Sequence, residues 1–284
     1  STPTAGTSNV RFGVNAGNSI TSGGNYNTVI GDEAGTAITT GDNNVAVGYG
    51  ALDAEDTGIG SVAIGYNALT AQNNDAINYN VAVGTSAGAA VTTGTQNSLI
   101  GYGAGLALTD ADFNTVLGTN ALATDTLGSK STAIGTQALA TQNFTSATDS
   151  FNTAIGYQTG LNLTTGVNNT IIGALVGDAL TTGSNNIAIG RDALGADTAG
   201  NSNIAIGRLA LGSQNFTSAT NSYNIGIGTQ AGYAITTGIR NVLIGGLAGD
   251  ALQDADFNVG VGYGALSADT LGSGSVAIGD FTLV

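Results

Sequence analysis

A pentapeptide that ends in glycine, such as Asn152–Gly156, recurs along the whole chain and limits what the chain can fold into. Sixteen copies occur in 284 residues, and 11 of the 15 intervals between their glycines are 17 residues long. A fixed short period of this kind is typical of stacked units that contact only their neighbours. We therefore interpret the chain as a repeat array and call each repeat a rung. The glycines that mark the sixteen rungs are Gly13, Gly31, Gly48, Gly65, Gly84, Gly101, Gly118, Gly135, Gly156, Gly173, Gly190, Gly207, Gly228, Gly245, Gly262 and Gly279.

Each copy of the pentapeptide is predicted to form a short β-strand. The residue before the marker glycine is always large and apolar, the residue two positions earlier is Val, Ile, Thr or Ser, and the residue between them is most often Ala. Because side chains alternate between the two faces of a strand, we expect the large residue to lie in the core. The intervening residue, such as Ala154, is then expected to face outward, against solvent or a neighbouring chain.

The residue four positions before the marker glycine is Asn in 13 rungs and Ser in three. Stacked Asn side chains can hydrogen-bond along a stack and satisfy a turn. We therefore predict an Asn ladder at the entry to the strands.

The residues after the marker glycine follow a second pattern with a period of four rungs. The fourth residue after the glycine is Gly in two rungs and Leu in the next two, as in Gly88, Gly105, Leu122 and Leu139. The seventh residue is apolar where the fourth is Gly and polar where the fourth is Leu. One large apolar side chain per rung is what a core of constant volume requires. We expect a second strand in this half, with a path that shifts between the two kinds of rung.

These patterns predict an all-β fold, a parallel β-solenoid of about 16 rungs that forms a single domain over residues 1–284. A helical fold fits neither the period nor the 46 glycines. The four-rung groups cover about residues 9–79, 80–151, 152–223 and 224–284. In the first three groups the fourth rung has a longer turn, and extra length in a solenoid is often on the binding face. Alternatively, these turns only close the rung. The turn residues predicted to contact a surface are Tyr79, Phe144, Phe151, Phe216 and Tyr223.

Charge and residue inventory argue against several function classes. With 19 acidic and five basic residues the net charge is −14, which disfavours nucleic acid and anionic membranes as partners. No apolar stretch approaches the length of a membrane span, so we predict no membrane insertion. The chain has no His and no Cys, which removes the usual catalytic triads and His-based zinc sites. We therefore predict no enzymatic activity and no cofactor.

Carboxylates are the remaining candidates for a chemical site. A pair such as Asp110 with Asp112, or Asp254 with Asp256, is the arrangement that glycoside hydrolysis would need. Their recurrence at equivalent places favours a repeated turn. The same acids could bind calcium, which prefers hard oxygen ligands. The alternative is a solvated acidic edge that keeps chains apart. The calcium candidates are Asp110, Asp112, Asp254, Asp256, Glu55, Asp125, Asp197 and Asp269.

Two copies of the pentapeptide, Ser61–Gly65 and Ser275–Gly279, together with Ala68, carry a resemblance to a known family. They resemble the head repeats of trimeric autotransporter adhesins of the Yersinia adhesin A type, and similar repeats occur in phage tail fibres. The resemblance covers all 16 rungs through the pentapeptide, and 13 of them also have the Ala three residues later. It implies a left-handed parallel β-roll, three chains side by side and a role in attachment. The repeat unit of that family is typically shorter than this one.

The predicted function is therefore an extracellular, cell-surface or virion-surface adhesin or structural rod. It would be a homotrimer that attaches to a host protein or glycan. The alternative is a filament subunit that polymerises end to end without a receptor. The first rung begins at Asn9 and the last stops five residues after Gly279 without a capping segment, although solenoid ends normally need caps.

Overall fold

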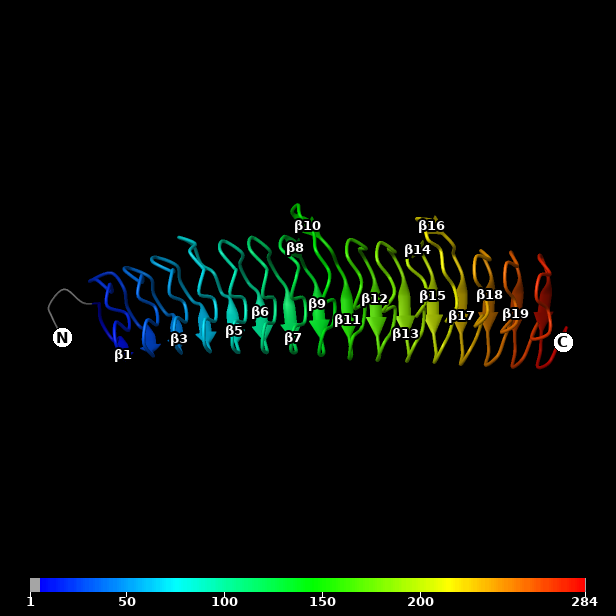
Figure 1. The fold of residues 1–284 in the computed structure, drawn as a ribbon, viewed down its shortest axis with the longest axis horizontal. Coiled ribbons are helices and arrows are strands. Elements are labelled where there is room, and N and C mark those ends of the chain that lie inside the picture. Colours follow the sequence, from blue (N-terminus) through cyan, green and yellow to red (C-terminus); the bar gives the residue numbers. More distant parts are fainter. Residues whose placement is uncertain (1–5, 284) are drawn as a thin grey trace. The chain divides into compact units, whose positions relative to one another are not determined.

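The computed structural model describes residues 6–283 and shows an all-β fold, with no helix among those residues. They form two compact units of eight rungs each. The first unit runs to Gln137 and also contains Asn143–Asp149, and the second contains Ala138–Gln142 and the described residues from Ser150 onward. Within each unit the strands of successive rungs lie side by side in parallel (Figure 1). The predicted parallel β-solenoid is confirmed.

Every rung contributes one three-residue strand to the main sheet of its unit. The strands pair in rung order, with equivalent residues opposite one another. In the first unit these main strands are β1 (Val10–Phe12), β2 (Thr28–Ile30), β3 (Val45–Val47), β4 (Val62–Ile64), β5 (Val81–Val83), β6 (Ser98–Ile100), β7 (Thr115–Leu117) and β9 (Thr132–Ile134). In the second unit they are β11 (Thr153–Ile155), β12 (Thr170–Ile172), β13 (Ile187–Ile189), β15 (Ile204–Ile206), β17 (Ile225–Ile227), β18 (Val242–Ile244), β19 (Val259–Val261) and β20 (Val276–Ile278).

A small two-stranded parallel sheet forms at one long turn in each unit. In the first unit β8 (Gly128–Ser129) pairs with β10 (Thr148–Asp149). In the second unit β14 (Gly200–Asn201) pairs with β16 (Thr220–Asn221). In the view of Figure 1 both small sheets lie at the top of their unit, above the strand arrows of the main sheet.

The main strands face the opposite way from the sequence-based prediction. From β2 onward the central residue of each strand is buried, whereas the first and third residues are partly or fully exposed. Ala63 and Leu99 have no exposed surface, while Ile64 is 38% and Ile100 is 40% exposed. The expectation that the residue before the marker glycine lies in the core is therefore wrong. Ala154, which was expected to face outward, is buried.

The predicted Asn ladder is confirmed, and it fills much of the interior. The Oδ1 atom of Asn44 accepts a hydrogen bond from the backbone N–H of Ser61 at 2.9 Å, and its Nδ2 donates to the carbonyl of Gly58 at 2.8 Å. Where Ser61 replaces the Asn, the Nε2 of Gln72 donates to the Ser61 Oγ at 2.8 Å. Each ladder residue thus satisfies buried backbone groups that no strand partner reaches. Because these amides occupy interior space, mostly small central strand residues fit beside them.

The alternation of Gly and Leu after the marker glycine is also confirmed, with a geometric cause. Gly35 (φ 50°) and Leu52 (φ 53°) adopt the same left-handed conformation in their rungs. A Cβ atom on Gly35 would lie 2.7 Å from Cδ1 of Ile38, so a side chain is excluded there. In the Leu rung, Leu52 is buried and the seventh residue is the polar Glu55. The left-handed conformation costs Leu about 1–2 kcal/mol, which burial of its side chain, worth about 1.5–3 kcal/mol, offsets.

The predicted second strand does not form. The second and fourth residues after the marker glycine have positive φ, as in Glu33 (57°) and Gly35 (50°). Repeated left-handed residues cannot continue a strand. Backbone hydrogen bonds still join this half to the next rung, for example from the N–H of Gly35 to the carbonyl of Ala51 at 2.9 Å. Each rung is therefore one short strand followed by a hydrogen-bonded turn.

Candidate interaction surfaces

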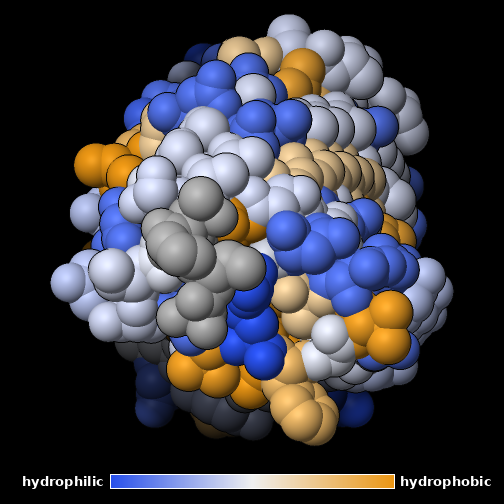
Figure 2. Space-filling model, turned by 90° about the vertical axis from the view of Figure 1, so that its left-hand side faces the viewer, coloured by the Kyte–Doolittle hydropathy of each residue, from blue (hydrophilic) through white to orange (hydrophobic). Residues whose placement is uncertain are grey.

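The outward residues of the main strands form a surface that we call the strand face, defined as the first and third residues of each main strand. No outward position of these strands, all within residues 6–283, carries a charged side chain. Figure 2, which looks onto one end of the chain, shows hydrophobic residues at the surface beside hydrophilic ones. The large apolar residues that are most exposed on the strand face are Val10, Phe12, Ile64, Ile100, Leu117, Ile187, Ile244, Val276 and Ile278.

The absence of charge on the strand face contrasts with the rest of the chain. The 19 acidic and five basic residues all lie at other positions. Two copies with a net charge of −14 each repel one another. An uncharged apolar surface is where that repulsion opposes contact least and where contact removes most apolar surface from water.

Exposed aromatic residues stand in the turns that precede the Asn ladder. Six of them share this position, and each has a positive φ. The ring of Tyr79 lies against Gly60 of the preceding rung, where an added Cβ would be 2.9 Å from a ring carbon. The guanidinium of Arg240 lies 5.5 Å from the ring centre of Phe257 in the next rung. These contacts run along the stack. The six residues are Tyr26, Tyr79, Phe113, Phe151, Tyr223 and Phe257.

The five residues predicted to contact a surface differ in exposure. Tyr79, Phe151 and Tyr223 are exposed, as a surface contact requires. Phe144 and Phe216 are only 6% and 7% exposed, so in their turns other residues, and not these two rings, are available for contact. The exposed residues at the tips of the turns are Thr145–Ala147 and Thr217–Ala219.

A buried aspartate holds the base of each of these two turns. The Oδ1 of Asp125 accepts hydrogen bonds from the backbone N–H groups of Gly128 and Phe144, both at 3.0 Å. The Oδ1 of Asp197 accepts the equivalent pair from Gly200 and Phe216, also at 3.0 Å. These bonds turn the backbone inward at residues 144 and 216.

Burial perturbs the carboxyl group in the second unit. The Oδ2 of Asp197 accepts a further hydrogen bond from the Nε2 of Gln214 at 2.6 Å. Burial raises the pKa of Asp197 above its ordinary value, and the hydrogen bonds from Gln214, Phe216 and Gly200 oppose that shift. The expectation of a solvated acidic edge is therefore wrong for Asp125 and Asp197, which have no exposed surface.

Glu55 occupies the equivalent place in the first group and is also fully buried, so the solvated-edge expectation is wrong for it too. Its Oε1 accepts from the backbone N–H of Gly58 at 2.7 Å. Its Oε2 accepts from Nε2 of Gln72 at 2.8 Å and Nδ2 of Asn78 at 2.9 Å. Burial raises the pKa of Glu55 despite these bonds. Asp269, the fourth member of the series, is partly buried and accepts from the N–H of Gly272 at 2.8 Å.

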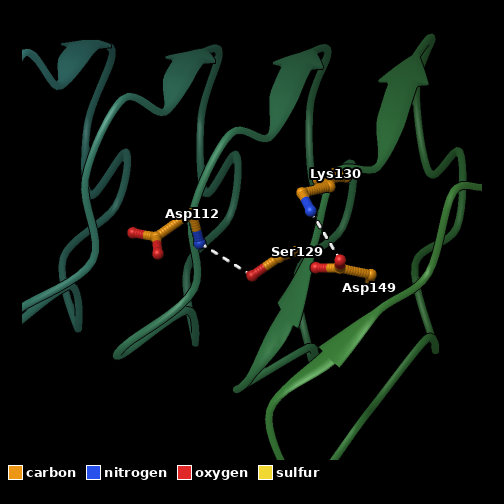
Figure 3. Close-up of polar contacts among 4 residues, drawn as sticks. All are labelled: Asp112, Ser129, Lys130 and Asp149. Atoms are coloured by element: carbon orange, nitrogen blue, oxygen red, sulfur yellow. Dashed lines mark hydrogen bonds and ion pairs between the residues drawn. The ribbon is translucent and has the colours of Figure 1, made fainter.

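Asp110 and Asp112 join neighbouring rungs in the first unit. Asp110 accepts a hydrogen bond from the Thr93 hydroxyl at 2.6 Å, and the Asp112 carboxylate accepts from the Thr95 N–H at 2.6 Å. The backbone N–H of Asp112 donates in turn to the Ser129 Oγ at 2.9 Å (Figure 3). The two aspartates thus hold the turn of the preceding rung.

Asp254 and Asp256 make the corresponding contacts in the second unit. The Asp254 Oδ1 accepts from the hydroxyls of Thr236 at 2.6 Å and Thr237 at 2.5 Å, and these bonds lower the pKa of Asp254. Asp256 accepts from the N–H of Ile239 at 2.8 Å. The recurrence of the two aspartate pairs therefore has a structural explanation in both units. Within residues 6–283, no group of three or more His, Cys, Asp or Glu residues is placed to hold a metal ion.

An exposed ion pair ties one small sheet to the strand beside it. Lys130, just before β9, pairs with Asp149 at the end of β10 (Figure 3). Both side chains are substantially exposed, so the pair contributes little stability.

Comparisons with known proteins do not assign this chain to a family. It matches no family model, no curated protein and no solved structure. The part of the chain that the structure describes contains no detectable pocket and no helix long and apolar enough to span a membrane.

Proposed function

We propose that this chain is a structural module of an extracellular, cell-surface or virion-surface fibre whose copies associate through the strand face. The observation that carries the proposal is the outward position of large apolar side chains such as Ile100 and Leu117, at 40% and 46% exposure. Exposed contiguous apolar surface in a folded chain marks an interaction site. The lack of charge on this face favours an identical copy as the partner.

The resemblance to trimeric adhesin head repeats supports three copies in the assembly. Three strand faces turned toward a common axis would shield one another from water. The long turns, which lie beyond one end of the main strands in each unit (Figure 1), would remain outside that contact. Their exposed tips, Thr145–Ala147 and Thr217–Ala219, would then be available to a host protein or glycan.

Sedimentation equilibrium tests the association. We expect the unaltered chain to have the mass of three chains of 27.7 kDa. The variant I100D/L117D, which places carboxylates on the strand face, should have the mass of one chain and an unchanged circular dichroism spectrum. Burying unpaired charges in an apolar contact is strongly unfavourable, which is the reason for the dissociation.

The matched control T145D/T217D adds the same charge at the exposed tips of the long turns and should remain trimeric. If the unaltered chain has the mass of a monomer over the accessible concentrations, the proposal is wrong. If I100D/L117D assembles as the unaltered chain does, association uses another surface, as in end-to-end polymerisation.

The attachment role needs a separate measurement. Candidate host glycans and matrix proteins, immobilised on a chip, should bind the trimer saturably. Binding should be lost when Thr145–Ala147 and Thr217–Ala219 are both replaced by Gly. Trimers that bind none of these surfaces would favour a purely structural rod.

A further inference from the structure

The repetition of the strand face creates a problem of register for any assembly that uses it. The third residue of all sixteen main strands is a large apolar residue, and the first is Val or Ile in ten of them. A neighbouring copy that slides by one or more rungs would find almost the same surface. Apolar contact alone therefore does not fix how two copies align.

One stretch of the strand face breaks this uniformity. The first residues of the consecutive strands β6, β7 and β9 are Ser98, Thr115 and Thr132. The next two main strands along the chain, β11 and β12, begin with Thr153 and Thr170. We call these two groups together, three residues in the first unit and two in the second, the hydroxyl block. Outside it, the only hydroxyl residue on the strand face is Thr28 in β2, all sixteen strands lying within residues 6–283.

The hydroxyls of the block have no hydrogen-bond partner among the described residues of their own chain. Ser98 and Thr115 are exposed, and Thr132, Thr153 and Thr170 are half-buried. In the single chain, water can satisfy all five. In an assembly that covers the strand face, each hydroxyl must meet another polar group or be buried without a partner, which is costly.

Two facing hydroxyls satisfy one another, because each can donate and accept a hydrogen bond. When two parallel copies are aligned, every hydroxyl of the block faces the block of the neighbouring copy. When one copy slides by a rung, Ser98 in the first unit faces Val81 instead, and Thr170 in the second unit faces Ile187. Sliding by a second rung leaves a further hydroxyl of each unit, Thr115 and Thr153, opposite Val or Ile.

We infer that the hydroxyl block sets the register of the assembly and selects aligned copies over staggered ones. This inference rests on the proposed association through the strand face. The register also decides whether the assembly is closed or open. Aligned copies related by rotation form a closed oligomer, whereas staggered copies leave rungs uncovered and recruit further chains into an open filament.

A single spin label at position 119 can report the register. Thr119 is exposed and follows β7 by two residues, and the chain has no cysteine, so T119C gives one labelling site. In the labelled chain we expect a single narrow distance between labels, measured by pulsed electron paramagnetic resonance. Removing the hydroxyls with S98V/T115V/T132V/T153V/T170V should produce several distances, because neighbouring copies then differ by whole rungs of about 4.8 Å.

The same variant should shift sedimentation from one species to a broad range of larger masses, because Val preserves the shape and apolar contact of Thr. A relocated block provides the matched control. Adding V45T/V62T/V81T to the variant places three consecutive hydroxyls on β3, β4 and β5. This combined variant should regain one narrow distance and one mass.

The outcomes separate this inference from the proposed function. If the unaltered chain is monomeric, both fail. If it is a single oligomer and the five-fold valine variant keeps the same narrow distance, association stands but the hydroxyl block does not set its register. If the relocated block fails to restore one distance while circular dichroism shows a native fold, the inference is also overturned.

Discussion

The interior of the rungs holds polar side chains beside apolar ones, whereas the strand face is apolar or hydroxylated and carries no charge. The interior contains Asn44, Glu55 and the small Ala63, all fully buried, whereas the strand face carries Ile64 and Ile100. Charged and amide side chains are normally at the surface and Ile inside. The difference shows that backbone hydrogen bonding by buried amides takes up part of the interior of a rung of 17 residues, beside buried apolar side chains such as Leu52. The large apolar side chains of the strand face lie where only a partner can cover them.

Removing one ladder residue should have the largest effect on the interior. In N169A the carbonyl of Gly183 and the N–H of Asn186 lose the partners that they have at 2.9 and 3.0 Å. Each unsatisfied buried group costs about 1–3 kcal/mol, so we expect the free energy of unfolding to fall by about 2–5 kcal/mol. Urea denaturation measures the change. N18A, at an exposed position, should change the free energy of unfolding by less than about 0.5 kcal/mol. Equal effects of the two variants would show that the ladder does not stabilise the interior.

Converting a Gly rung to a Leu rung tests the volume compensation. An added Cβ at Gly105 would lie 2.8 Å from Cδ1 of Leu108 and 2.8 Å from Cδ2 of Leu99. G105L should therefore cost about 2–4 kcal/mol from left-handed strain and overpacking. The double variant G105L/L108Q copies the natural Leu rung and should recover at least about 1 kcal/mol relative to the sum of the single variants. Strictly additive effects would show that the two positions do not share one space.

The buried carboxyl group of Asp197 predicts a pH dependence of stability. Burial raises the pKa of this group in the folded chain above the ordinary value that it has in the unfolded chain. As the pH rises through the interval between these two pKa values, the unfolded chain releases the proton first, so stability falls and then levels off above the folded pKa. D197N should lack this fall, and D280N, at an exposed position, should keep it. Unfolding free energies of the three proteins that stay parallel from pH 3.5 to 7 would contradict this assignment.

The smallest effect is expected for the exposed ion pair. K130M removes the partner of Asp149 at side chains that are 39% and 48% exposed. Solvent screens such pairs, so the free energy of unfolding should change by less than about 1 kcal/mol and the change should shrink in high salt. A larger, salt-independent loss in urea denaturation would indicate that Lys130 has a role in the packing of the small sheet.

The repeat features that depend on backbone requirements could be predicted from the sequence. The marker glycines, the Asn ladder and the Gly–Leu alternation each follow from one local need that recurs in every rung. The orientation of the strands could not be predicted from alternation alone, because a period of two does not say which face is inside. The signal was present in the central strand residue, which is Ala or Gly in ten of the sixteen main strands. A preference for small residues at one position of a strand indicates that this position faces a confined interior, although Leu99 and Ile171 are also accommodated there.

The candidate site was predicted less well, because burial of polar groups is invisible in a repeat pattern. The sequence predicts solvent exposure for Glu55 and Asp197, but both are buried and accept hydrogen bonds from amide side chains and backbone N–H groups in the interior. Phe144 stands in a long polar turn but is drawn inward as its N–H bonds to Asp125. The strand face was missed as a site because its residues were assigned to the core. The absence of charged residues from the first and third positions of every main strand was the signal that could have identified this surface.

The orientation and covering of the strand face can be tested together with one thiol at a time, since the chain has no cysteine. Val116 is 1% exposed and the adjacent Leu117 is 46% exposed. In native protein we expect the thiol of V116C to resist a thiol reagent at every protein concentration. The thiol of L117C should react in dilute solution and become protected as the concentration rises and copies associate. A thiol at position 117 that is protected even in the monomer, or reactive at every concentration, would contradict an outward strand face covered by self-association.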